Sequence, residues 1–199
     1  MINKNFQIYF DCGFSRIRAG AFNKDNPNES FFTESNFFFD QSQIDLEIQK
    51  IVIFLEKKTG QYLDDINLMI DSSKMMSIGI SVAKKLDGPK LKKEDVQFII
   101  QEAKQQISKN YKNNNIVHII INNYKINNID YSYLPNDIEC NLISLDIFFI
   151  CLPNEIIDFF KKTFLKSNIL INQIICSSYA KAINCKENLG LIGDVSFID

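Results

Sequence analysis

The spacing of hydrophobic residues changes repeatedly along this chain, and this change limits the folds that the chain can adopt. Short apolar-rich runs at 6–10 and 17–22 are typical of strands, and the turn signal between them predicts a hairpin. From position 43 the apolar residues instead recur every three or four positions, which predicts an amphipathic helix that ends at Thr59-Gly60. The residues of this helical face are Ile44, Ile48, Ile51, Val52 and Leu55. Alternating strands and helices indicate an α/β chain built on a sheet.

The predicted elements fall into three groups along the chain. The first is three strands, a helix and a strand, which ends at Ile70. The second begins with a strand at 78–83, continues through a helix and two strands, and ends with a helix that Pro153 opens. The third is a strand at 169–175, a helix at 177–184 and a strand at 189–198. We predict that the second group is an insertion between two parts of one sheet-based domain.

Composition and charge exclude several classes of protein. A net charge of -2 provides no basic stripe, so we expect no nucleic-acid partner. The five cysteines contain no C-x-x-C pair, and with His118 as the single histidine a zinc site is not predicted. No apolar run approaches the roughly 18–20 residues that span a bilayer, and the N-terminus does not resemble a signal peptide. We therefore expect a soluble cytoplasmic protein.

The turn after the first strand carries the pattern Asp11-x-Gly13-x-Ser15-Arg16, which is also common in ordinary hairpin turns. Five later stretches follow this pattern in an order that makes chance similarity less credible. They are Leu55–Gly60, Ile78–Ile80, Glu94–Val96, His118–Ile121 and Ile169–Ala180. Together, over nearly the whole chain, these residues resemble FtsA, a cell-division protein of the actin/Hsp70-like ATPase superfamily.

The resemblance implies a fold in two parts. Residues 1–75 and 168–199 would form part of an actin-like subdomain 1A of the ribonuclease-H type. Residues 76–167 would form an inserted α+β subdomain of the SHS2 type, called 1C. The expected fold class is therefore α/β with an α+β insertion.

The resemblance also implies roles for the residues of the first loop. Gly13 and Ser15 would contact the phosphates of ATP, because a glycine lets phosphate approach the backbone and a hydroxyl adds a donor. Arg16, which stands where the family has a lysine, would offer positive charge. Asp11 would hold Mg²⁺ through water. Asp199 stands where the second phosphate loop would begin, and it completes the expected cofactor-binding set.

No residue can be assigned to catalysis, since phosphoryl transfer needs several positioned groups and no water-activating side chain can be placed. The rest of the nucleotide site would follow Asp199, so we expect this chain alone to bind ATP and Mg²⁺ weakly or not at all. We also expect little or no hydrolysis. An autonomous actin-like ATPase remains an alternative.

By this resemblance the chain would be an adaptor of the division ring, at the inner face of the cell membrane at the septum. Subdomain 1C would self-associate and receive the cytoplasmic tail of a late division protein. FtsZ would bind only if the 2B region were supplied, and the membrane only through a C-terminal helix that this sequence does not include. A second alternative is the pilus-assembly branch of the same superfamily.

Three further features have simpler structural interpretations. His118 lies in an apolar strand, which favours a structural role over a catalytic or metal-binding one. Glu94-Asp95 could be a paired-carboxylate site, but acidic residues are also typical of a helix start. The lysines between Lys84 and Lys93 could meet an acidic partner or an anionic membrane surface, although a solvated loop explains them more simply.

Overall fold

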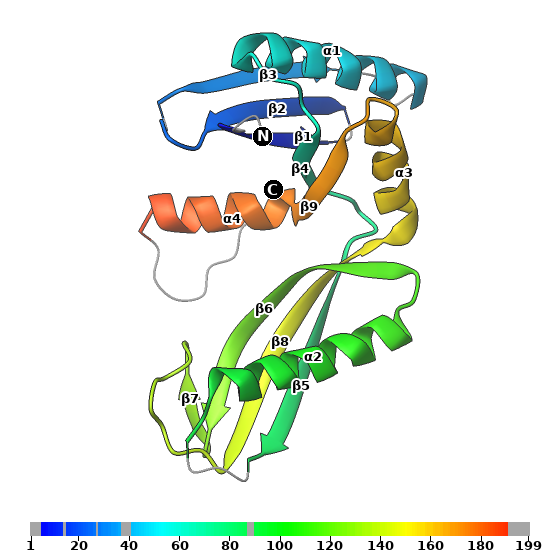
Figure 1. Cartoon of the computed structure of the whole chain (residues 1–199). Helices are drawn as coiled ribbons and strands as arrows, with labels where there is room; N and C mark the ends of the chain where they lie inside the picture. The colour runs from blue at the N-terminus through cyan, green and yellow to red at the C-terminus, as the bar shows by residue number, and fades with distance from the viewer. Residues whose placement is uncertain (1–4, 14, 27, 37–40, 87–89, 191–199) are drawn as a thin grey trace. The chain divides into compact units, whose positions relative to one another are not determined.

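The computed structural model describes residues 5–13, 15–26, 28–36, 41–86 and 90–190, and these divide into two compact units. The first unit is built from two separate segments, 1–73 and 157–199. The second unit is built from the single segment 74–156. The second unit is therefore inserted into the first, as the order of elements predicts (Figure 1).

The first unit contains a five-stranded sheet. Its strands are β1 (Phe6–Cys12), β2 (Arg16–Asn23), β3 (Ser30–Asn36), β4 (Asp65–Ile70) and β9 (Leu170–Cys176). Their order across the sheet is β3-β2-β1-β4-β9. The first three strands form an antiparallel meander, whereas β4 is parallel to β1 and β9 is parallel to β4. The carboxyl ends of β1, β4 and β9 therefore meet at one edge of the sheet.

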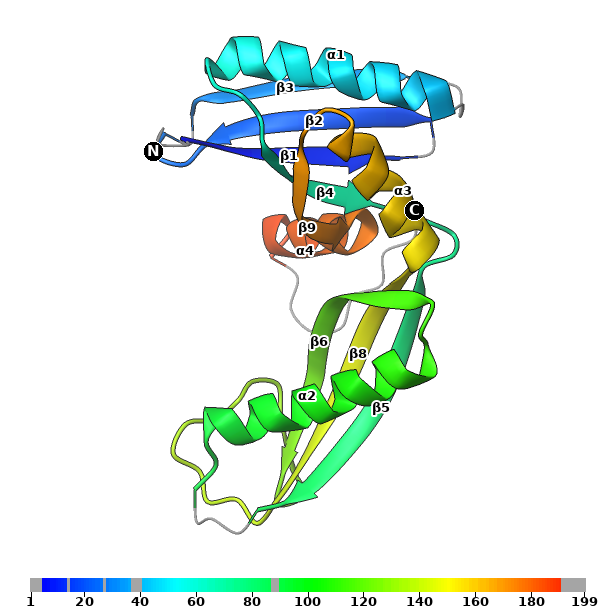
Figure 2. The ribbon, with the colours of Figure 1, turned by 45° about the vertical axis from the view of Figure 1, so that its right-hand side comes forward.

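Helix α1 (Gln41–Thr59) packs against β2 and β3 and closes the core on one side of this sheet. The predicted helical face is confirmed, since Ile44, Ile48 and Leu55 are each no more than 2% exposed. Every second residue of β1 points into the same core, as a half-buried strand requires. Helix α4 (Ser177–Asn188) lies on the opposite side of the sheet from α1 (Figures 1 and 2).

The boundary of the insertion differs from the prediction at its second end. The sequence-based boundary follows residue 167, whereas the first unit already begins again at Ile157. Most of helix α3 (Asn154–Leu165) therefore belongs to the first unit. The physical reason is Phe164, which is fully buried and packs edge-on against Phe10 of β1 with 5.0 Å between ring centroids. The ion pair of Lys166 with Asp45 of α1 ties the same region to the first unit.

The second unit is a four-stranded antiparallel sheet with one helix on one face. Its elements are β5 (Met76–Lys85), α2 (Lys93–Asn110), β6 (Asn114–Ile126), β7 (Ile129–Tyr131) and β8 (Leu142–Pro153). The strand order is β5-β8-β6-β7. Val96, Ile99, Ala103 and Ile107 of α2 are buried against the central strand β8, whose Leu145 is fully buried in the same core.

The predicted strands and helices are present over the described residues, but several bounds differ. Strands β6 and β8 extend beyond the predicted runs, and the sequence gives no signal for the three-residue β7. The strand predicted at 189–198 falls mostly outside the described residues, as does Asp199. Among the described helices, none combines the length and the apolar character that crossing a membrane requires.

Candidate functional site

The carboxyl ends of the three parallel strands bring Asp11, which was predicted, and Asp71 and Ser177, which were not, to one edge of the first sheet. Cys12 lies beside Ile70, and Ile70 lies beside Cys176 in the paired register. Asp71 directly follows β4, and Ser177 directly follows β9. In α/β sheets ligands bind outside the carboxyl ends of parallel strands, so this edge is the place to look for a site.

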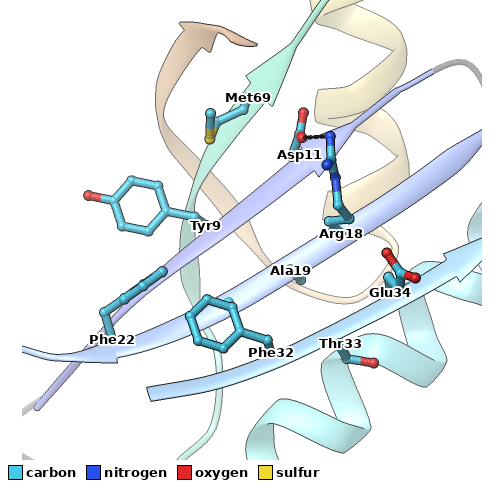
Figure 3. Close-up of a pocket in the computed structure, with 10 residues that line it drawn as sticks. Tyr9, Asp11, Arg18, Ala19, Phe22, Phe32, Thr33, Glu34 and Met69 are labelled. Atoms are coloured by element: carbon cyan, nitrogen blue, oxygen red, sulfur yellow. Dashed lines mark hydrogen bonds and ion pairs between the residues drawn. The ribbon is translucent and has the colours of Figure 1, made fainter. Parts of the chain in front are cut away.

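Asp11 is held by two hydrogen bonds at this edge. The Nη2 atom of Arg18 donates to its Oδ2 atom over 2.6 Å, as the dashed line in Figure 3 marks. The Ser177 hydroxyl donates to its Oδ1 atom over 2.8 Å. Ser177 is 1% exposed, so this carboxylate joins the first hairpin to the start of α4 from within the unit.

Asp71 caps the N-terminus of α4. Its Oδ1 atom accepts hydrogen bonds from the backbone N–H of Ser178 over 3.0 Å and from the Ser178 hydroxyl over 2.9 Å. A carboxylate is stabilised at this end of a helix, because the first N–H groups have no partners within the helix and carry partial positive charge. Asp71, the second acidic residue at this edge, therefore has a structural role as a helix cap.

The first hairpin turn is tight. The N–H of Gly13 donates to the carbonyl of Arg16 over 2.9 Å, and this bond closes the turn. A side chain at position 13 would place its Cβ atom 3.3 Å from the same carbonyl oxygen, so the close approach of the two strands favours glycine. The predicted phosphate contact of the Gly13 N–H would therefore compete with the hydrogen bond that forms the turn. Ser15 is exposed at the tip.

The two arginines of β2 have different partners. Arg16, the predicted cation of the site, donates to the Asn36 side chain over 3.1 Å and pairs with Glu34 at 3.5 Å, both on β3. Arg18 instead stands opposite Asp11 in the β1–β2 ladder and pairs with it. The structure therefore identifies Arg18 as the cation beside Asp11. No local pattern in the sequence marks Arg18, because the cross-strand partner of Asp11 depends on the register of β1 and β2.

These residues fit Mg-ATP poorly by themselves. Arg18 already neutralises the charge of Asp11 that would attract hydrated Mg²⁺. Each oxygen of Asp11 also accepts one hydrogen bond, which leaves a single lone pair on each for a metal-bound water. Within the described ranges, no three residues among histidine, cysteine, aspartate and glutamate are grouped closely enough to hold a metal ion. Asp199, the remaining predicted ligand, lies outside the described residues.

The cysteine beside the site is not a nucleophile. Cys12 is 4% exposed, and burial first, then the adjacent charge of Asp11, raises the pKa of its thiol far above the usual range. The thiol therefore stays protonated at neutral pH, which makes it unreactive. Cys12 serves as a small apolar side chain in the core.

The open face of the first sheet, beside Asp11 and Arg18, is hollowed and aromatic (Figure 3). Tyr9 and Phe22 meet edge-to-face at 5.7 Å, and Phe22 and Phe32 at 5.2 Å. The hollow has a volume of about 430 Å³, and Gly20 lies in its floor, where a Cβ atom would come within 2.9 Å of the Phe22 ring. The run of phenylalanines that begins at residue 31 predicts core side chains, but Phe32 is 63% exposed, so this prediction is wrong at that position.

The remaining candidate residues lie in the second unit and have structural partners. His118 stands opposite Ile150 in the sheet, and burial lowers the pKa of its imidazole, which favours the neutral form. Asp95 accepts the backbone N–H of Lys92 over 3.0 Å, which confirms the helix-start interpretation of Glu94-Asp95. Lys84 lies 3.4 Å from the centre of the Phe98 ring on α2.

Comparison with known proteins shows the fold but not a family. No family model matches the chain, and no curated protein matches it. Among 27 similar chains in solved structures is one from a PilM-PilN type IV pilus biogenesis complex, with 9% identity and a TM-score of 0.57. The match covers 92% of this chain and 51% of that one.

A second similar structure is a Bacteroides thetaiotaomicron VPI-5482 protein with an actin-like ATPase fold and unknown function. It is 13% identical, with a TM-score of 0.43 over 96% of this chain and 61% of that one. This chain thus spans about half of the pilus-complex chain. The predicted fold class is confirmed as mixed α/β: the chain has two sheets with helices, and its fold is similar to that of part of the pilus-complex chain.

Proposed function

We propose that this chain is an assembly protein with an actin-like fold, which acts through protein–protein contacts and does not hydrolyse ATP by itself. The observation that carries this proposal is the bonding of Asp11. The carboxylate expected to hold Mg²⁺ is neutralised by Arg18 at 2.6 Å and also bonded to Ser177 at 2.8 Å. A carboxylate whose charge is already balanced by an arginine of its own chain attracts a cation less strongly, and this favours a structural protein over a catalyst.

We place the assembly function in type IV pilus biogenesis. Support comes from the pilus-complex chain, which matches both units of this chain and not only the sheet that carries Asp11. That structure is a complex of two proteins, PilM and PilN. By analogy, this chain would bind a partner protein of the pilus machine and would work at the inner face of the membrane through that partner.

A division-ring adaptor is the second candidate function. The order of the FtsA-like stretches, from Asp11 through His118 to Ala180, favours it. In this version the unit of residues 74–156 would self-associate and bind the tail of a late division protein. The two candidates share the assembly function and differ in the machine that they serve.

Calorimetry of the purified chain with Mg-ATP tests the claim that it is not an ATPase by itself. We expect a dissociation constant of about 1 mM or weaker, which corresponds to only about -4 kcal/mol of binding. Arg18→Ala, which removes the cation beside Asp11 and leaves the Ser177 bond, is compared with Arg16→Ala, which leaves the Asp11 pair in place. Micromolar binding by the wild-type chain, or measurable hydrolysis, would show that the Asp11 pair does not close the site.

Deletion of the gene in its own organism separates the two machines. The pilus proposal predicts cells that lose surface pili and divide normally. Filamentous cells with intact pili would instead establish the division candidate. Cells with normal pili and normal division would contradict both.

A further inference from the structure

The two sheets have four edge strands among the described residues, namely β3, β9, β5 and β7. An edge strand offers unpaired N–H and C=O groups, and proteins protect such edges with charges, bulges or short length. Strand β3 carries Glu34, β9 pairs with β4 through a register shift, and β7 is three residues long. Three of the four edges therefore carry one of these protections.

Strand β5 lacks these protections over most of its length. It pairs with β8 in unbroken register over ten residues, from Met76 to Lys85. The eight residues Met76–Ala83 contain neither proline nor a charged side chain. Exposed Ser77, Gly79, Ser81 and Ala83 give this strand small side chains on the face away from α2. Such an edge is suited to pairing with another strand.

The apolar side chains of β5 are incompletely buried. Ile78, Ile80 and Val82 pack against the core of the second unit but stay only partly buried, whereas Ile147 and Phe149 on the adjacent β8 are at most 1% exposed. A further strand beside β5 would cover them, because side chains directly opposite one another on the same face lie about 5 Å apart. The edge therefore gains both backbone hydrogen bonds and apolar burial when it is paired.

The charges at the two ends of β5 select the orientation of the added strand. Lys84 and Lys85 end the strand, whereas Glu155 lies near its beginning, where it pairs with Lys74 at 2.6 Å and is 66% exposed. A second copy in parallel orientation would bring four lysines together. In antiparallel orientation the lysines of each copy lie near the neutral Lys74–Glu155 pair of the other and more than a Debye length of about 10 Å from each other.

We propose that two copies of this chain associate through antiparallel pairing of β5 with β5. The pairing joins two four-stranded sheets into one sheet across a two-fold axis, and it places both α2 helices on the same face. Side-chain alternation restricts the register to pairs on the same face, and centring it on Ile80 places Ser77 opposite Ala83 of the second copy. This proposal rests on the proposed assembly function and specifies the surface by which the chain assembles.

A charge-exchange experiment on the full chain tests this register. Ser77→Lys/Ala83→Lys places lysine opposite lysine twice in the dimer, whereas Ser77→Lys/Ala83→Glu places lysine opposite glutamate twice. Within one copy the two positions are roughly 20 Å apart along the strand, so the two substituted side chains meet only across the dimer. Both positions are exposed, which leaves the core unchanged.

Sedimentation over a concentration series measures the result. We expect a monomer–dimer equilibrium for the wild type, a dimer dissociation constant about tenfold weaker for the Lys/Lys variant, and a constant within about threefold of wild type for the Lys/Glu variant. Hydrogen exchange should show β5 amides gaining protection as the wild type dimerises.

A wild type that stays monomeric at several hundred micromolar, or two variants that associate equally, would overturn the proposal. Protection of β5 that arises only after a different protein is added would show that the edge receives a strand from that protein. Failure here is distinguishable from failure of the proposed function, because Mg-ATP calorimetry and the pili of the deletion strain do not depend on β5 pairing.

Discussion

At the scale of single residues, Asp11 changes from an expected metal-binding group to a structural link. Its two oxygens join β2 to the first residue of α4 through Arg18 and Ser177. Arg18 is half exposed, so the ion pair itself contributes little stability, as is usual for pairs that water can reach. The buried hydroxyl of Ser177 is therefore the stronger of the two contacts.

Replacement of this hydroxyl is a direct test of the link. Ser177→Ala removes a hydrogen bond to a charged group, and such bonds contribute about 1.5–3 kcal/mol when buried. Because Asp11 keeps some contact with water, at 18% exposure, we expect a loss of about 1–2 kcal/mol in urea unfolding. Ser178→Ala is the matched control, since Ser178 is exposed and its backbone N–H still caps α4 on Asp71. Equal losses in the two variants would show that Ser177 does not link Asp11 to the helix.

The turn of this site can be predicted from the sequence, whereas the partners of Asp11 cannot. The turn at Asp11-Cys12-Gly13 is recognisable from the sequence, because aspartate and glycine between two apolar runs are typical of tight turns. Arg18 and Ser177 could not be assigned by local pattern, since their approach to Asp11 depends on strand register and on a contact across 166 positions of sequence. The prediction chose Arg16, which is nearer in sequence but turns toward β3.

At the scale of elements, the β6–β7 hairpin shows how a turn can fix a strand that has no signal of its own. Asn127 and Asn128 have φ angles of 49° and 69°, the left-handed conformation of a two-residue hairpin turn. The Asn127 side chain also accepts the N–H groups of Asn141 and Leu142 and donates to the Glu139 carbonyl. The hairpin and the start of β8 are therefore held together by one residue.

Substitution of Asn128 measures the free energy that a residue with a side chain loses by adopting the positive φ of this turn. Asn128→Val places a β-branched residue at positive φ, which should destabilise the chain by about 1–2 kcal/mol. Asn128→Gly tolerates the same angle and should change stability by no more than about 0.5 kcal/mol. Urea unfolding measures both, and backbone amide spectra report the pairing of β7. A valine variant as stable as the glycine variant would exclude this turn geometry.

Elements with one dominant period are predictable over most of their length from this sequence, whereas β6 is predicted only over residues 116–121 and β7 is not predicted. Strand β6 contains two register shifts, after Ile116 and after Ile121, and each reverses the alternation of its side chains. A pattern of period two is therefore interrupted twice along 13 residues. The three residues of β7 are too few to show any period.

At the scale of the whole molecule, the inserted unit was predicted, but its second boundary was misplaced. Its first boundary is marked by a change from one strand to another near residue 74. At the second boundary β8 continues through Pro153 directly into α3, so no loop and no change of polarity marks the point where the chain enters the other unit. Burial of Phe164 decides the assignment, and burial is a property of the folded chain rather than of its local sequence.

The boundaries at 73/74 and 156/157 lead to the prediction that residues 74–156 fold on their own. Eleven buried residues form the core of this unit, and all of them lie within the segment, from Val96 to Cys151. A segment of this size can bury enough surface for marginal stability. We expect a cooperative thermal transition by circular dichroism and dispersed amide resonances for the isolated segment.

Two substitutions in the isolated segment test whether its fold is the one described. Ile99 is fully buried, so Ile99→Ala should cost about 2–5 kcal/mol and unfold a segment of marginal stability. Phe98 on the same helix is 50% exposed, and Phe98→Ala should leave the segment folded, with the loss of its contact to Lys84. An isolated segment without a cooperative transition would show that the second unit depends on the first. A segment equally tolerant of both substitutions would show that its fold does not depend on the core under α2. The isolated segment would then not have the sheet described here, on which the pairing of β5 depends.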